Sequence, residues 1–208
     1  LKNSACGPYI VSNTLFHFTK SFERLAAILR DGFKLSHVPE ILPKKTPEGE
    51  LMYYIAPMVC FCDIPLGGVK VHLRRYGNYG LGIHKSFCMH TNMNPVFYIY
   101  DSKAFNSILP EPLRNFSSII PYVKKYYGKN VKKNENFRFY NEREWRYVKS
   151  KEVRMLHGDI NKIINKCYEL DQNPVQYLSF NPSNVEYIIL ENKSEIHKMV
   201  EFIDAYID

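Results

Sequence analysis

The chain has 208 residues, 45% of them hydrophobic, so it can bury a sizeable core and is not a disordered chain. A formal net charge of +7 favours an anionic partner such as a nucleotide, a nucleic acid or an acidic protein surface. No apolar run approaches the ~18 residues of a membrane helix, and the five cysteines lack the spacing of a secreted disulfide framework. We therefore expect one cytoplasmic domain over residues 1–208 that does not contact a membrane.

The first predicted elements are a strand over residues 15–19 and a helix directly after it. Ser21 is a favourable N-cap, apolar residues recur at helical spacing behind it, and Gly32 is a typical stop. Residues 33–57 contain four prolines and little periodicity, which predicts a long loop.

The rest of the chain alternates short strands with helices of unequal length. Because regular βαβ units are missing, the pattern predicts an α+β fold and not a doubly wound one. The expected strands are 58–62, 79–84, 95–100, 144–150, 175–180 and 185–190; the expected helices are one beginning near residue 63, pieces within 101–127, 159–170 and 193–207.

His17 and Thr19 lie two residues apart at the end of the first strand, so their side chains share a face. A histidine and a threonine in this position can hydrogen-bond a sugar hydroxyl and a neighbouring amide or phosphate. The alternative is a structural histidine whose hydrogen bonds are made within the core, and the same sequence pattern fits it.

Glu142 and Glu144 open a late strand in the stretch "FYNEREWRYVKS". In an extended segment both carboxylates point the same way, and Arg143 and Arg146 are at hand to neutralise them. A carboxylate beside a sugar suits reactions with an oxocarbenium-like transition state, as in glycoside cleavage. The alternative is an exposed, charged strand end.

Tyr76 and Tyr79 stand next to glycines, which allow a ligand to approach the backbone while a tyrosine ring stacks on it. Aromatic core residues beside turns explain the pattern equally. The nearby cysteines and histidines of 60–90 do not have the spacing of structural zinc sites, so buried reduced thiols are expected there.

Residues 124–146 combine eight Lys or Arg with three Glu, interleaved with aromatic residues. Basic and aromatic side chains together suit phosphate backbones and stacked bases. A solvated loop has a similar composition, but this segment leads directly into the glutamate pair.

Taken in order, these motifs resemble ADP-ribosyltransferase-type folds, in which a His-x-Thr strand precedes a late Glu-x-Glu strand. Over about residues 14–205 the chain more closely resembles the AbiGi-type family of bacterial abortive phage-infection proteins. The segments that carry this resemblance are "FHFTKSFERLAAILRDGFKLS", "MVCFCDIPL", "YGNYGLGIHK", "NPVFYIY", "EREWR" and "LSFNPSNVEYIIL".

The resemblance implies a split β-sandwich core of ADP-ribosyltransferase type with flanking helices, clamping NAD in a cleft. It also implies a phage-defence role, since the AbiGi-type family is classed among antitoxins of a two-gene system. Two functions remain open: transfer of ADP-ribose from NAD to a nucleic acid or protein acceptor, or a catalytically silent antitoxin that binds a cognate toxin or operator DNA.

Residue roles follow only from the resemblance. His17 would hold the adenosine-side ribose and Thr19 would support the phosphates or the backbone nearby. Tyr76 or Tyr79 would stack on the nicotinamide.

Glu144 would bind the nicotinamide ribose and Glu142 would orient the acceptor. Arg75, with Lys70, Arg74 or Lys85, is expected to neutralise the diphosphate. One motif departs from many transferases: "CFCDI" stands where hydroxyl side chains are usual.

Overall fold

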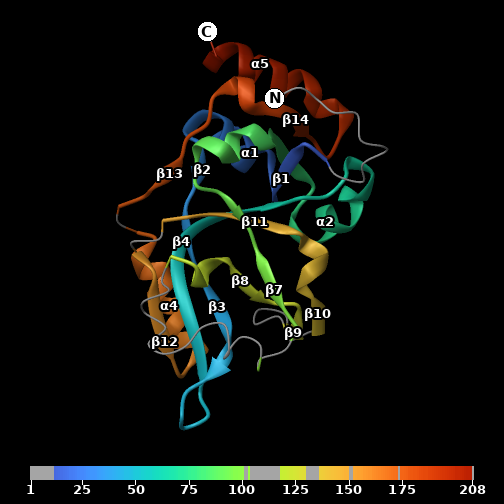
Figure 1. Cartoon of the computed structure of the whole chain (residues 1–208). Helices are drawn as coiled ribbons and strands as arrows, with labels where there is room; N and C mark the ends of the chain where they lie inside the picture. The colour runs from blue at the N-terminus through green and yellow to red at the C-terminus, as the bar shows by residue number, and fades with distance from the viewer. Residues whose placement is uncertain are drawn as a thin grey trace.

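The structure is a computed structural model that describes residues 12–100, 103, 118–129, 136–149, 152–172 and 174–207. Its centre is an eight-stranded sheet whose main path runs β14-β5-β1-β4-β11-β6, with β3 and β12 also pairing with β4 (Figure 1). These strands are β1 (Thr14–Thr19), β3 (Ser36–Lys45), β4 (Leu51–Cys62), β5 (Tyr79–His84), β6 (Asn94–Pro95), β11 (Glu144–Val148), β12 (Arg154–His157) and β14 (Val185–Ile189).

Every pairing in this sheet is antiparallel, so the expected α+β class is confirmed at this coarse level. A parallel pair occurs apart from it, between β7 (Phe97–Ile99) and β8 (Val123–Lys125). Two small antiparallel pairs complete the strands: β9 (Tyr127–Lys129) with β10 (Asn136–Arg138), and β2 (Phe33–Lys34) with β13 (Tyr177–Leu178).

The first strand and helix form as predicted. α1 (Phe22–Asp31) begins where the Ser21 side chain accepts a hydrogen bond from the Arg24 backbone N–H. It ends at Gly32, whose φ of 92° is in the region that favours glycine.

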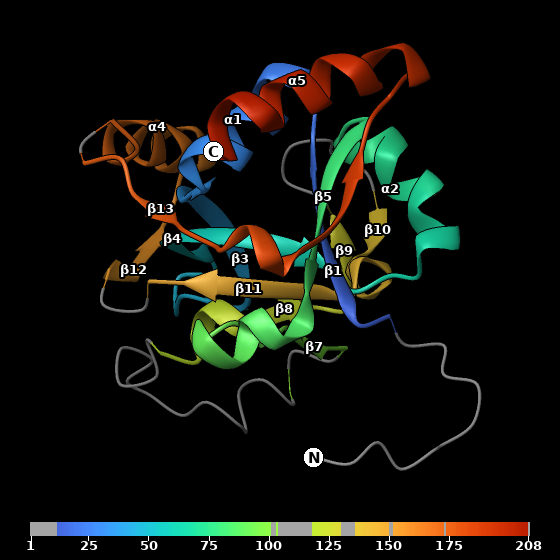
Figure 2. The ribbon, with the colours of Figure 1, turned by 90° about the horizontal axis from the view of Figure 1, so that it is seen from above.

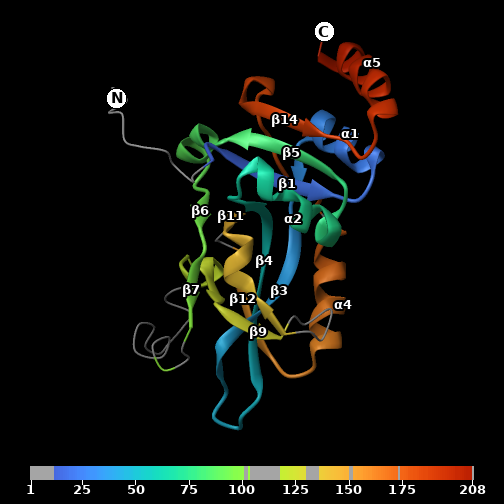
Figure 3. The same ribbon diagram turned by 90° about the vertical axis from the view of Figure 1, so that its right-hand side faces the viewer.

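The prediction of a long loop over 33–57 is wrong, because this region contains β2, β3 and the first half of β4. β3 and β4 form an antiparallel hairpin in which Pro39 stands opposite Ile55 (Figure 3). A proline lacks the N–H that a central strand needs, but β3 pairs with β4 on one side only among the described residues. Pro39 thus marks an edge strand.

The sheet is narrowly joined between β1 and β4. β1 follows β5 over its whole length, but only Phe16 and Cys62 are in register between β1 and β4. Beyond this pair the two strands diverge.

Helices cover both halves of the molecule. α5 (Ile196–Ile207) crosses α1 at one end, as the view from above shows, and the two helices bury Phe22, Leu25 and Met199 in the largest core cluster (Figure 2). α4 (Ile160–Leu170) lies against β3 on the side of β12 (Figures 1 and 3). None of the helices in the described ranges contains an apolar stretch of the length that a bilayer crossing requires.

The remaining predictions have mixed outcomes. α2 (Val69–Tyr76), α4 and α5 form where helices are expected, and β5, β11 and β14 where strands are expected, while the strand over 175–180 shrinks to β13. Most of the predicted helical region 101–127 is outside the described residues. Over 118–127 the structure has the short turn η4 (Ile120–Tyr122) and the strand β8 instead.

Candidate functional site

A pocket of about 560 Å³ opens where β1 and β4 diverge. Residues of β1, β3, β4 and β8 line it, together with Tyr76 of α2, the turn before β11 and the first residue of β11. Its lining includes His17, Glu40, Cys60, Cys62, Tyr76, Lys124, Lys125, Phe139, Glu142 and Glu144.

The two glutamates come together through a turn and not through an extended strand. Glu142 ends the short 3-10 turn η5 (Phe139–Glu142), and Arg143 then adopts a left-handed conformation with φ of 43°. Glu144 begins β11 opposite Cys62 of β4. Only 6% of Glu142 and 5% of Glu144 is exposed, so the alternative of a solvated strand end is wrong.

Lys124 of β8 holds the glutamate pair. Its ammonium nitrogen donates to Glu142 Oε2 at 2.9 Å and to Glu144 Oε2 at 2.8 Å, and it lies 3.5 Å from Glu40 Oε1. The sequence predicts that Arg143 and Arg146 neutralise the two glutamates. Among the described residues, Arg146 and Lys124 are the cations in contact with these carboxylates, and Arg143 is not.

Arg146 lies behind Glu144 on the same face of β11 and is fully buried. Its Nε donates to Glu144 Oε1 at 2.7 Å, and Nη2 donates to Glu40 Oε1 at 2.9 Å. Nη1 donates to the Tyr54 hydroxyl and to the Pro121 carbonyl. This buried charge network therefore consists of Glu40, Lys124, Glu142, Glu144 and Arg146.

The network sets the charge state of Glu144. Burial alone would raise the pKa of this carboxyl, but Arg146 and Lys124 together outweigh burial and bring the pKa far below its ordinary value. Three carboxylates against two cations leave one formal negative charge beside the pocket.

His17 bridges the gap between the diverging strands. Its Nδ1 is 2.9 Å from the Cys60 carbonyl of β4, and since a carbonyl can only accept, Nδ1 carries the proton. The ring packs edge-on against Phe33 and near Phe61. Burial lowers the pKa of His17 despite the opposing Cys60 hydrogen bond, so the ring is neutral at pH 7 with Nε2 as an acceptor.

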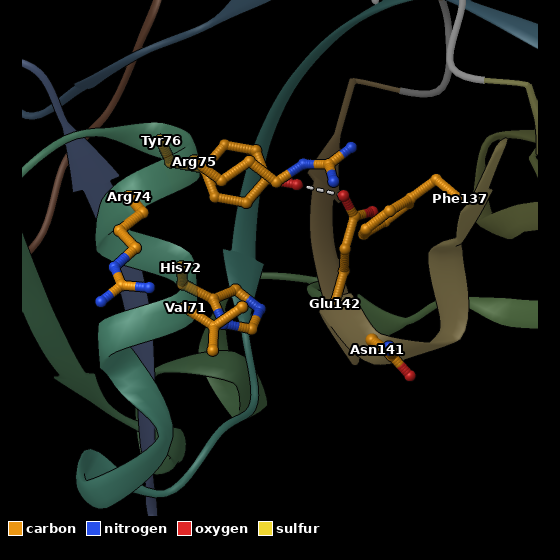
Figure 4. A pocket seen from close by; sticks show the side chains of 8 residues that line it. All are labelled: Val71, His72, Arg74, Arg75, Tyr76, Phe137, Asn141 and Glu142. Carbon is orange, nitrogen blue, oxygen red and sulfur yellow. Dashed lines mark hydrogen bonds between the residues drawn. The ribbon is translucent and has the colours of Figure 1, made fainter. Parts of the chain in front are cut away.

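Only one of the two candidate tyrosines reaches the pocket. Tyr76, at the end of α2, lines it and donates its hydroxyl to Glu142 (Figure 4). Tyr79 instead packs in the core and donates to Glu195 Oε1 at 2.7 Å.

Thr19 and Arg75 are not part of this pocket lining. Thr19 is buried at the far end of β1, opposite Tyr79 of β5. The Arg75 guanidinium lies over the Phe137 ring, 3.5 Å from its centroid, in a neighbouring hollow.

Cys60 and Cys62 face the pocket as protonated thiols. Burial, followed by the nearby Glu144 charge, raises the pKa of both well above the usual range. Neither is therefore an activated nucleophile, and no group of metal-ligating side chains was found in the part of the chain that the structure describes.

Sequence reasoning missed three members of the site: Glu40, Tyr54 and Lys124. Glu40 and Tyr54 lie in the region that was expected to be a loop. Lys124 is the first residue of the basic and aromatic stretch 124–146. Nothing in its local sequence distinguishes it from the other lysines of that stretch.

Comparisons with known proteins point to one family. The family model described as "Putative abortive phage resistance protein AbiGi, antitoxin" matches residues 42–191. This range includes four members of the buried charge network, Lys124, Glu142, Glu144 and Arg146, but neither Glu40 nor His17. The protein named "Abortive phage resistance protein AbiGi" of Lactococcus lactis subsp. cremoris is 27% identical over 210 aligned positions, covering 79% of this chain and 82% of that protein. No solved structure matches significantly.

Proposed function

Because this chain belongs to the AbiGi family, we propose that it acts in bacterial abortive phage resistance and that its pocket binds NAD. The observation that carries the proposal is the convergence of His17, Tyr76, Glu142 and Glu144 on one pocket. The volume of about 560 Å³ is typical of small-molecule sites. The narrow β1–β4 join also supports a split-sandwich arrangement of ADP-ribosyltransferase type.

Different side chains of the pocket match different parts of NAD: the carboxylates match the nicotinamide, and the other lining residues match the ribose and the phosphates. The nicotinamide ring of NAD is cationic, and the excess negative charge of the buried network favours it near Glu142 and Glu144. The neutral His17 offers Nε2 to a ribose hydroxyl, and Phe139 offers an apolar ring face. Lys125, also in the lining, can neutralise a phosphate.

A transfer reaction would use Glu144 as the group that stabilises positive charge. The bond between the ribose carbon and the nicotinamide nitrogen breaks, the nitrogen keeps the electron pair, and the sugar carries the developing charge. An acceptor oxygen or nitrogen then bonds to that carbon and loses a proton. For this step the Glu144 carboxylate has to exchange its contact with Lys124 for one with the ribose.

The test is calorimetry of NAD binding to the wild-type protein and to Leu51→Trp. Leu51 lies at the pocket and is 39% exposed, so a larger side chain there narrows the pocket without disturbing the core. We expect binding by the wild type and a loss of at least about tenfold in affinity in the variant, which is about 1.4 kcal/mol. No heat of NAD binding by a folded wild-type protein would refute the proposal.

Turnover is measured separately, as nicotinamide released by the wild type and by Glu144→Gln. The matched control is Glu201→Gln, the same change at an exposed glutamate of α5. Circular dichroism first checks that Glu144→Gln is folded under the assay conditions. Release that is lost in the folded variant and kept in the control supports transfer; equal release by all three proteins contradicts a role for Glu144.

A second candidate function is a catalytically silent antitoxin that binds a toxin protein. The matching family is described as an antitoxin family, and Glu144 is held by two cations in the way of a structural carboxylate. The measurement is co-purification with the product of the neighbouring gene. Tight association together with no nicotinamide release would favour this candidate over transfer.

A further inference from the structure

A second pocket, of about 330 Å³, lies between α2 and the segment formed by β10 and η5 (Figure 4). The pocket is open to solvent beside Val71, a lining residue with 71% of its surface accessible. The lining residues are Val71, His72, Arg74, Arg75, Tyr76, Phe137, Asn141 and Glu142.

Arg75 and Phe137 form a flat stacked pair across this pocket. Figure 4 shows Arg75 extending from α2 toward the β10 side, and its guanidinium carbon is 3.5 Å from the Phe137 ring centroid. Stacking on Phe137 uses one face of the guanidinium plane, and the same carbon also lies 5.7 Å from the centroid of the Tyr76 ring. The N–H edge of the guanidinium remains available. Among the described residues neither Arg74 nor Arg75 has a carboxylate within ion-pair distance, so both positive charges are available to a ligand.

His72 packs into the wall of the pocket, where its ring lies near those of Phe18 and Tyr76. Only 9% of it is exposed, and its Nδ1 is buried without a hydrogen-bond partner among the described residues. Because this nitrogen has almost no accessible surface, a ligand in the pocket does not reach it, and the evidence for a ligand rests on the Arg75–Phe137 pair.

The small pocket adjoins the larger one. Tyr76 and Glu142 belong to the lining of both, and the hydrogen bond from the Tyr76 hydroxyl to Glu142 forms the partition between them. A ligand in the small pocket therefore lies beside Glu142, and the Tyr76–Glu142 contact separates it from the rest of the larger pocket.

We infer that the small pocket binds one nucleotide of a single-stranded nucleic acid. A base stacks on the partly exposed Arg75–Phe137 pair, Val71 adds an apolar rim, and the phosphate faces the N–H edge of Arg75. A bare anion would not need the ring and the aliphatic rim, and a duplex would not offer an unstacked base.

The pocket volume is near the lower end of the range for small-molecule sites, which suits a single nucleotide. Strand binding depends on these contacts alone. Only its meaning as the acceptor side of an NAD-dependent transfer rests on the proposed function.

The experiment measures fluorescence anisotropy of a labelled single strand of about ten nucleotides, the scale of site that such proteins cover. We expect the wild type to bind it and Arg75→Gln to weaken binding by about 5- to 100-fold, the usual effect of losing a stacked base. Phe137→Leu is expected to weaken binding as well, because the stacked pair loses its ring.

The matched control is Lys70→Gln, which removes the same charge from an exposed position of α2 outside the pocket. We expect its affinity to stay close to that of the wild type. Equal weakening by Lys70→Gln and Arg75→Gln would show that only net charge matters and would overturn the inference.

Other strands and ligands complete the test. Preference for a duplex over the single strand, or binding of free AMP without binding of the strand, would also overturn the inference. Circular dichroism melting of each variant checks that it is folded. Strand binding without NAD binding would sink the proposed function alone; NAD binding without strand binding would sink this inference alone.

Discussion

Glu144 and Arg146 lie on the same face of β11, buried together with Lys124. A buried charge is tolerated only with partners, and here each cation touches at least two carboxylates. Removing one member leaves the others in an apolar surrounding without compensation. The buried charge network is thus sensitive to single substitutions whether or not the pocket has catalytic activity.

We predict that Glu144→Gln destabilises the fold by about 3–5 kcal/mol, as is usual when one partner of a buried ion pair is lost. Urea unfolding followed by circular dichroism measures this difference. Glu201→Gln, at an exposed site, is expected to change the unfolding free energy by less than about 0.5 kcal/mol. Equal stability of Glu144→Gln and the wild type would contradict the role assigned to Lys124 and Arg146.

The low pKa of Glu144 also predicts an acid dependence of stability. Its stabilising contribution is complete above the ordinary value of 4.5 and is lost as the pH falls from there toward the lower folded-state pKa. Urea unfolding at a series of pH values below 5 should show a steeper loss for the wild type than for Glu144→Gln. Parallel curves for the two proteins would show that Glu144 is not tied to the cations.

At the scale of elements, the end of α2 is fixed against β1 by a glycine. Gly77 has φ of 131°, and a Cβ at this position would lie 2.0 Å from the Thr19 carbonyl oxygen. No side chain fits there without moving one of the two backbones. The position of Tyr76 in the pocket therefore depends on its neighbour in the sequence.

We predict that Gly77→Ala lowers the unfolding free energy by about 2–5 kcal/mol, since backbone strain and overpacking add. Gly49→Ala is the matched control: its φ is 88°, but an added Cβ meets nothing within 4 Å. Its cost should be limited to the strain of about 1–2 kcal/mol. Thermal melting of both variants distinguishes the two contributions, and equal losses would disprove the backbone clash.

Elements with local signals could be predicted from the sequence. α1 and α4 begin at the capping side chains of Ser21 and Asp159, and α1 ends at Gly32. The β3–β4 hairpin could not be predicted, because the prolines of an edge strand have the same local signature as a loop. Whether a proline-containing segment is a loop or an edge strand depends on whether one of its sides pairs with another strand. That pairing is a property of the folded sheet and not of the local sequence.

The candidate site was predictable to the same degree. Glu142 and Glu144 could be predicted as site residues because they stand two residues apart at the start of a strand. His17 could be predicted because it lies just before a helix with a clear N-cap. Lys124 and Glu40 join the glutamates only through the packing of β8 and β3 around β11, and no local pattern marks them. Thr19, Tyr79 and Arg75 have suitable chemistry for the predicted site but lie outside the lining of the larger pocket.

At the scale of the whole molecule, α5 covers one side of the largest core cluster. Met199 is 3% exposed and packs in the cluster that contains Phe22 and Leu25 of α1. This contact joins the last helix to the first. Folding of the chain therefore depends on a segment that follows the last strand, β14.

We predict that Met199→Ala costs about 2–5 kcal/mol of unfolding free energy, as is typical for truncation of a buried side chain. Val200→Ala, next to it and 47% exposed, is expected to stay within about 0.5 kcal/mol of the wild type. Chemical unfolding monitored by far-ultraviolet circular dichroism compares the two. A larger loss for Val200→Ala would show that α5 packs through a different face.

The single registered pair between β1 and β4 has a mechanical consequence. A continuous ladder would make the separation of two neighbouring strands rigid, since widening it breaks several backbone hydrogen bonds at once. Past Phe16 the two strands are joined instead by a side chain, through the contact between the His17 imidazole and the Cys60 carbonyl. Widening the space between β1 and β4 would therefore break fewer backbone hydrogen bonds than separating β1 from β5, which are paired along the whole of β1.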